Sequence, residues 1–165
     1  MTLRELNERD CRGFADAVGW AFERSPWVAA RAWTLRPFES LAALHEAMAG
    51  VVAAASREEQ LALLRAHPDL GANLEMSEAS TREQAEAGLT SLARHELIRL
   101  RTLNAAYREK FGFPFLYAVK GAAPGDVLEA LERRLTSTRE SERREALRQV
   151  YRIALFRLEE VVSQP

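Results

Sequence analysis

Residues 94–110, RHELIRLRTLNAAYREK, decide the fold class, because their apolar positions recur with the period of an α-helix. Gly112 follows closely, and glycine is common just after the end of a helix. The apolar stripe is formed by Leu97, Leu100, Leu103 or Asn104, Tyr107 and Phe111. The same period recurs along nearly the whole chain, so the sequence predicts an all-α fold. No repeat or linker interrupts it, and we expect one compact multi-helix domain over residues 1–165.

Capping patterns predict further helices on both sides of this stretch. Ser56 and Glu59 have the spacing of a capping box, and Ser80 and Glu83 repeat it. The helix that Ser56 opens should stop before Pro68, because proline cannot continue a helix without losing a hydrogen bond. Other helices are expected over residues 8–23 with Asn7 as cap, from Ser25-Pro26, from Ser40, from Pro124 and over residues 140–161.

Residues 113–119, FPFLYAV, are the one stretch that is predicted to be extended. The stretch is too isolated to form a sheet, so it is interpreted as a buried connector. Residues 111–115 are dense in aromatic side chains, which is typical of a core. A pocket wall is the alternative, since flat heterocycles are often held against apolar surface and backbone amides.

Charge and cysteine content make several classes of protein poor expectations. The 23 basic and 24 acidic residues give a net charge of -1, so neither nucleic acid nor an anionic membrane is an expected partner. Cys11 is the single cysteine, which rules out an internal disulfide and a cysteine-based metal cluster. The charged N-terminus does not resemble a signal peptide, and the longest apolar run is too short to span a bilayer. We therefore expect a cytoplasmic protein.

Of the 3 histidines, only His67 stands where chemistry is expected. His45 and His95 lie within helical patterns among polar neighbours, which indicates solvated positions. His67 lies where a helix must end, and functional residues are frequent at such junctions. The alternative is a helix-terminal histidine stabilised by the helix dipole. The spacing of the three does not match a metal site, so no metal is expected.

Glu83 and Arg157 each permit a structural and a functional interpretation. Glu83 would complete the second capping box, or its helix start would bind a polar ligand. Arg157 lies one step from the apolar face of the last helix. Its head would either remain in water or offer a planar fork to a carboxylate.

Several segments, taken in order, carry a resemblance to a known family. They are residues 25–28, 36–38, 67–71, 80–89, 104–115 and 152–159. Among them His67-Pro68-Asp69-Leu70-Gly71 alone would be a weak match, whereas the ordered set is specific. The chain resembles the 2-oxo-4-hydroxy-4-carboxy-5-ureidoimidazoline (OHCU) decarboxylases of ureide metabolism over nearly its whole length.

The resemblance implies a fold, a reaction and a set of residues. The family is all-helical, needs no metal or organic cofactor, and is usually dimeric, so a homodimer is expected. It converts OHCU to (S)-allantoin and carbon dioxide. The family's catalytic histidine, glutamate and arginine fall on His67, Glu83 and Arg157. Its substrate-binding positions fall on Pro68, Ser80, Gln84, Phe115, Leu116, Tyr117, Ala118 and Val119.

Tyr117 departs from the family pattern, which often has a branched aliphatic residue in this region. Its bulk leaves open a related ureide or hydantoin-like acid as the substrate. A helical interaction module without catalysis is the alternative from another class. It predicts an exposed apolar groove in place of a polar pocket.

Overall fold

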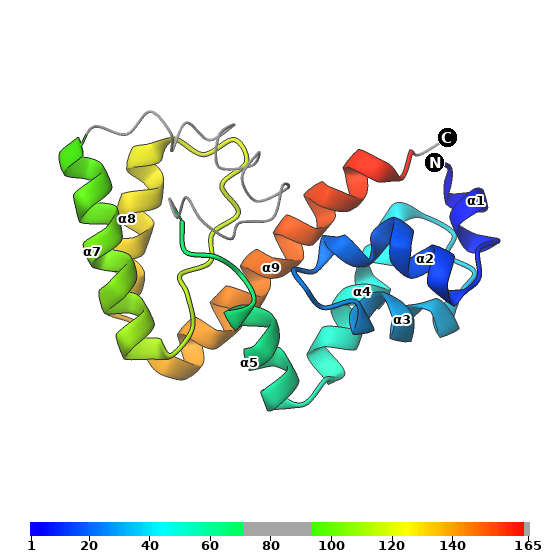
Figure 1. Cartoon of the computed structure of the whole chain (residues 1–165), viewed down its shortest axis with the longest axis horizontal. Coiled ribbons are helices and arrows are strands. Elements are labelled where there is room, and N and C mark those ends of the chain that lie inside the picture. The colour runs from blue at the N-terminus through cyan, green and yellow to red at the C-terminus, as the bar shows by residue number, and fades with distance from the viewer. Residues whose placement is uncertain (71–93, 164–165) are drawn as a thin grey trace. The chain divides into compact units, whose positions relative to one another are not determined.

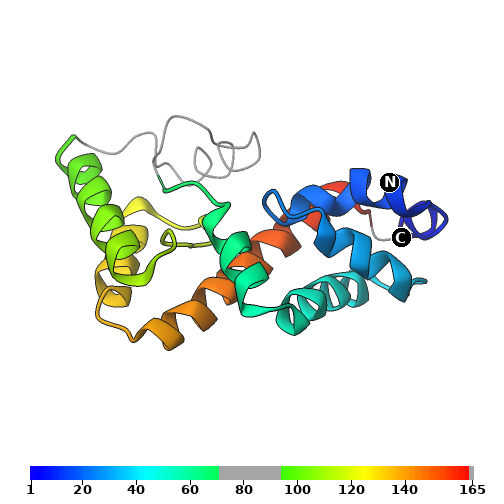
Figure 2. The same ribbon diagram turned by 60° about the horizontal axis from the view of Figure 1, so that its bottom comes forward.

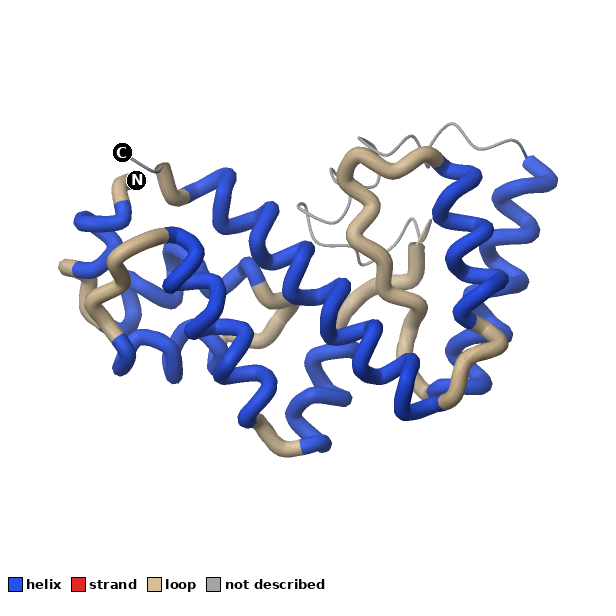
Figure 3. Tube along the Cα trace, turned by 180° about the vertical axis from the view of Figure 1, so that it is seen from behind, coloured by secondary structure: helices blue, strands red, loops and turns tan. Residues whose placement is uncertain are grey.

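The computed structural model describes residues 1–70 and 94–163 (Figure 1). The loop expected over residues 71–76, the predicted capping box from Ser80 to Glu83 and the helix after it lie outside these residues. Within the described ranges the chain forms helices and no strand, with one isolated β-bridge between Thr2 and Ser163 (Figure 3). The all-α prediction is confirmed.

The chain divides into two compact units. The first unit comprises Met1–Ala66 and Tyr151–Pro165, and the second comprises His67–Val150. The last helix, α9 (Arg139–Val161), contributes residues to both. The expectation of a single domain over residues 1–165 stays a prediction.

The first unit is a cluster of short helices. They are α1 (Leu3–Asn7), α2 (Cys11–Val18), α3 (Trp27–Ala32), α4 (Leu41–Ala54), α5 (Arg57–Arg65) and two 3-10 turns, Gly19–Ala21 and Trp33–Leu35. Helix α3 packs against both α2 and α4. The core of the unit includes Leu6, Phe14, Phe22, Val28, Leu44, Met48, Leu63 and Leu64, all of them fully buried.

The prediction of one helix over residues 8–23 with Asn7 as its cap was wrong. Asp10 caps α2 instead, and its carboxylate accepts a hydrogen bond from the Gly13 amide at 2.8 Å. Asn7 is the last residue of α1, and its side-chain amide bonds both backbone groups of Phe38 at 2.9 Å. Both residues are good caps by type, so only the distant partner Phe38 distinguishes them.

The start of α3 also differs from its prediction. The helix begins at Trp27, and no side chain caps it. The hydroxyl of Ser25 donates to the carbonyl of Glu23 at 2.9 Å instead of capping the helix. Ser25 therefore stabilises the turn that holds Glu23.

The predicted starts of α4 and α5 are confirmed. Ser40 accepts a hydrogen bond from the Ala43 amide at 3.0 Å, and Ser56 with Glu59 forms the expected capping box. Helix α5 ends at Arg65, before Pro68 as predicted. The chain therefore leaves the helix just before His67.

The second unit is built on α7 (Arg94–Phe111), α8 (Pro124–Arg134) and the first half of α9. Helices α7 and α8 lie side by side in both ribbon views (Figures 1 and 2). Gly112 ends α7 with a φ of 79°, the left-handed conformation that glycine adopts most easily. The three predicted helices are confirmed here. The residues after α7 form the predicted buried connector without a strand, and its extended conformation stays a prediction.

An aromatic cluster forms the core of the second unit. The ring of Tyr107 lies 4.6 Å from that of Phe111, 6.0 Å from Phe113 and 5.4 Å from Phe115, between centroids. All four rings are buried. The dense aromatic stretch over residues 111–115 is therefore part of the core, which was the first of the two interpretations given for it.

Candidate active site

His67 lies just past the end of α5 and is only 5% exposed. The residues after it are tied to α7. The side-chain amide of Asn104 donates to the Leu70 carbonyl at 2.9 Å, and Arg108 pairs with Asp69 at 3.0 Å. His67 is therefore a buried imidazole on a backbone that is held from α7, which suits a group that must meet a substrate in one orientation.

The other two histidines have different surroundings. His95 is exposed, as predicted. His45 is half-buried, and its Nε2 lies 2.8 Å from the carbonyl oxygen of Tyr151, so the prediction of a solvated position was wrong for it. The described residues contain no cluster of three or more metal-ligating side chains.

The connector over residues 113–119 is buried and is held by side chains from two helices. Arg134 of α8 donates to the carbonyl of Leu116 at 2.5 Å. Gln149 of α9 accepts a hydrogen bond from the amide of Ala118 at 2.9 Å. The guanidinium of Arg134 also lies over the ring of Phe115, 4.5 Å from its centroid. Both Arg134 and Gln149 were absent from the residues predicted by sequence.

Arg134 belongs to a buried polar network. Its Nε donates to Glu142 at 2.5 Å, and the hydroxyl of Tyr107 donates to the same carboxylate oxygen at 2.5 Å. Burial, together with the hydrogen bond to Glu142, raises the pKa of Tyr107 well above its ordinary value, so the phenol stays a donor. The pair of opposite charges compensates for the cost of burying each. The network therefore fixes the guanidinium that holds Leu116.

Arg157 lies in the first unit and is 1% exposed, so its head is not in water. Its Nη1 donates to the carboxylate of Glu23 at 3.0 Å and to the Trp20 carbonyl at 3.2 Å. Glu23 is itself buried, and residue Arg24 after it has a φ of 47°. Sequence reasoning missed Glu23, because its partner is 134 positions away.

Comparison with known proteins adds to this geometry. The family model described as OHCU decarboxylase matches residues 7–159. The chain is 49% identical to the 2-oxo-4-hydroxy-4-carboxy-5-ureidoimidazoline decarboxylase of Haloferax volcanii, over 99% of this chain and 97% of that protein. It is 46% identical to the uric acid degradation bifunctional protein PucL of Bacillus subtilis, over 99% of this chain and 33% of that protein.

The chain belongs to the OHCU decarboxylase family. A solved structure supports the same assignment at the level of the fold. The crystal structure of (S)-allantoin synthase superposes with a TM-score of 0.83 at 34% identity, covering 99% of this chain and 54% of that one.

The family's site positions fall on this structure in three groups. His67, Pro68 and residues 115–119 all belong to the second unit, where α7, α8 and α9 hold them. Arg157 belongs to the first unit. Ser80, Glu83 and Gln84 lie outside the described residues. The roles of all these side chains stay predictions.

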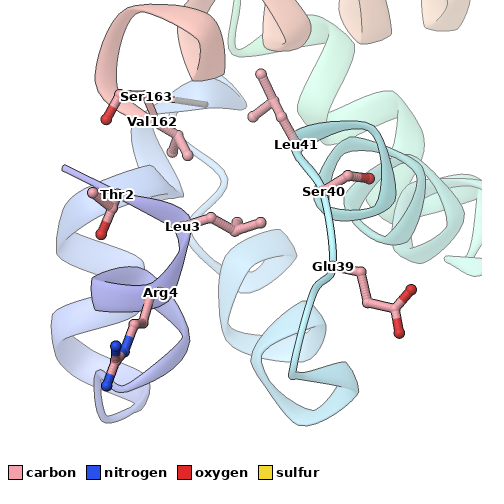
Figure 4. A pocket seen from close by; sticks show the side chains of 8 residues that line it. All are labelled: Thr2, Leu3, Arg4, Glu39, Ser40, Leu41, Val162 and Ser163. Atoms are coloured by element: carbon pink, nitrogen blue, oxygen red, sulfur yellow. The ribbon is translucent and has the colours of Figure 1, made fainter. Parts of the chain in front are cut away.

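A separate pocket of about 490 Å³ opens in the first unit, among α1, the start of α4 and the residues after α9 (Figure 4). The side chains of Leu3, Leu41 and Val162 lie around it, and the charged ends of Arg4 and Glu39 point away from it. None of the family's site positions within the described residues lines this pocket. Its apolar lining does not suit a small polar anion.

Proposed function

We propose that this chain converts OHCU to (S)-allantoin and carbon dioxide in urate degradation, with His67, Glu83 and Arg157 as its functional side chains. The family match over residues 7–159 carries the proposal. The geometry supports it, because the histidine is buried and the backbone after it is held from α7. The reaction needs no cofactor in this proposal, since the substrate's own ring accepts the charge that the departing carboxylate leaves.

His67 acts as the general acid or base at the carbon that bears the hydroxyl and carboxyl groups. Loss of carbon dioxide moves its electron pair into the ring and leaves an enol that includes the neighbouring ureido-bearing carbon. The hydroxyl then gives up its proton to become the ring carbonyl, and a proton must reach one face of the ureido-bearing carbon. Histidine suits this step because its ordinary pKa of about 6.5 lies near the working pH. Delivery to one face sets the stereochemistry of the product.

The other residues orient the substrate. Glu83 orients His67 or accepts hydrogen bonds from the ring N–H groups. Arg157 holds a carboxylate or ureido oxygen, and its pairing with Glu23 fixes the guanidinium for that task. The ring is held by Pro68, Ser80, Gln84 and the backbone of Phe115, Leu116, Tyr117, Ala118 and Val119.

Tyr117 bears on the range of substrates. Its ring stacks on that of Phe115, with 6.0 Å between centroids and an interplanar angle of 15°. The tyrosine ring therefore packs against the aromatic core. Because its bulk is taken up there, it gives no reason to prefer a related ureide or hydantoin-like acid over OHCU as the substrate. Membership of a decarboxylase family favours an enzyme over the helical interaction module.

The location, oligomeric state and partners of the enzyme are part of the same proposal. No helix in the described residues is long and apolar enough to cross a bilayer. We place the protein in the cytoplasm and expect a homodimer that binds a small ureido-imidazoline and no nucleic acid. Size-exclusion chromatography with light scattering measures the oligomeric state.

The test follows circular dichroism while urate is converted by urate oxidase and hydroxyisourate hydrolase, which supply the labile substrate. Adding the protein should speed growth of a stable (S)-allantoin signal. His67→Asn should remove most of this rate, by roughly a hundredfold or more, and keep the helical spectrum. His95→Asn is the matched control, because His95 is exposed, and should match the wild type. Racemic product forming at the spontaneous rate would overturn the proposed function.

A further inference from the structure

Two buried side chains, Arg134 and Gln149, hold the backbone of the connector on which the proposed substrate ring rests. Arg134 is 5% exposed and Gln149 is 6% exposed. They come from different helices, α8 and α9, and bond the Leu116 carbonyl and the Ala118 amide. Each side chain has a second partner: Arg134 donates to Glu142, and Gln149 donates to Glu145 at 2.9 Å. The bonding atoms are therefore fixed on both sides.

The spacing of these two bonds orients the connector. In an extended chain, residues two apart turn their backbone groups to the same side, and the residue between them turns to the other side. With the connector extended, as its sequence predicts, the bonds at Leu116 and Ala118 occupy one side of the chain. Among the described residues, no group bonds to the N–H or C=O of Tyr117 or Phe115, whereas the carbonyl of Val119 accepts from the Ala122 amide at 2.9 Å.

We infer that Arg134 and Gln149 are positioning residues, which hold Leu116 and Ala118 so that the N–H and C=O groups of Phe115 and Tyr117 face the substrate. A ring with alternating N–H and C=O groups pairs naturally with such a peptide edge. The inference rests on the proposed function and deepens it, because it says which peptide groups of the connector bind the ring. It also explains why a glutamine and an arginine are buried at this point, where apolar side chains would pack more simply.

Gln149 offers the sharper test, because Arg134 also belongs to the ion pair with Glu142 and its removal would damage the fold. Gln149→Leu removes the acceptor at nearly constant volume. It should raise KM for OHCU roughly three- to tenfold, the loss of about one hydrogen bond, and change kcat by less than about twofold. The amide of Ala118 should also exchange its hydrogen faster, which is measured by NMR without any substrate.

A conservative change at Glu145 provides a second check. Glu145→Gln keeps an oxygen acceptor for the Gln149 amide and leaves the bond from the Ala118 amide in place. This variant should keep KM within about twofold of the wild type. The matched control is Asn7→Leu, which removes the two hydrogen bonds between the Asn7 side-chain amide and the backbone of Phe38. It should lower the melting temperature and leave KM unchanged.

The outcomes separate the two proposals. A wild type that does not turn over OHCU overturns the proposed function, and the positioning role for that substrate with it. An active wild type, with KM unchanged in Gln149→Leu, overturns the positioning role alone. An equal rise of KM in Asn7→Leu also overturns it, because the effect would then follow from lost stability and not from the connector.

Discussion

At the scale of single residues, the buried pair of Arg157 and Glu23 changes how the C-terminal arginine is understood. An arginine beside an apolar stripe usually keeps its head in water, but this guanidinium is buried with a carboxylate 3.0 Å away. Burying either charge alone is costly, so each residue depends on the other. A guanidinium held in this way is already oriented before any substrate arrives, which reduces the entropy cost of binding.

The dependence of Arg157 on Glu23 predicts strong coupling between them. Arg157→Met should lower the free energy of unfolding by about 3–5 kcal/mol, because it removes the cation that lies 3.0 Å from the buried Glu23 carboxylate. Glu23→Gln added to Arg157→Met should recover part of this loss. Urea unfolding of the two single variants and the double variant gives the coupling energy, expected to be at least about 1 kcal/mol. Strictly additive losses would contradict the pair.

Residue identity alone did not reveal which polar side chains are buried. Periodicity places Arg157 near the apolar face of its helix, but it gives no partner for it. The same holds for Gln149 and Ala118, which are 31 positions apart, and for Tyr107 and Glu142, which are 35 apart. Such contacts depend on how the helices pack, so the amino-acid pattern along one helix cannot identify them.

At the scale of elements, the helix starts that rest on contacts within one turn could be predicted. Ser40, Ser56 and Pro124 all mark helix starts correctly, because a cap bonds an amide three residues away or presets φ. Asn7 was misplaced because its amide is used by Phe38 and Asp10 is an equally good cap. The resemblance to the family supplied the predicted roles of the site residues, which local patterns left open.

The N-terminus of α5 gives a prediction about pH, and this helix leads directly to His67. Glu59 accepts from Arg31 at 2.5 Å and from Ser56, and the bond to Arg31 is the main cause that lowers the pKa of this carboxyl below 4.5. A lowered pKa stabilises the fold above the ordinary pKa, and this stability is lost as the pH falls through the folded value.

Glu59→Gln should therefore lower the melting temperature near neutral pH, and the difference from wild type should shrink as the pH falls below about 4.5. Thermal scans of both proteins between about pH 3 and pH 7 measure this. Glu58→Gln is the control, because Glu58 precedes Glu59 in the same turn but has no part in the capping box. A difference that grows in acid would contradict the sign.

At the scale of the whole molecule, the family and the helical class could be predicted because ordered motifs extend over almost the entire chain. The arrangement of the proposed site residues could not, since they follow α5, lie in the connector, belong to α9 or fall outside the described ranges. The proposed activity predicts that the product binds the folded chain and thereby stabilises it.

Product binding tests this directly. (S)-allantoin should raise the melting temperature, because a ligand that binds only the folded state stabilises it by about 2.7 kcal/mol at a hundred times its Kd. For a chain of this size that corresponds to a rise of roughly 5–10 °C. (R)-allantoin is the matched ligand and should raise the melting temperature less, because the proposed site distinguishes the two faces of the ureido-bearing carbon. Differential scanning calorimetry measures the shift. Equal shifts with both enantiomers would argue against a stereospecific site.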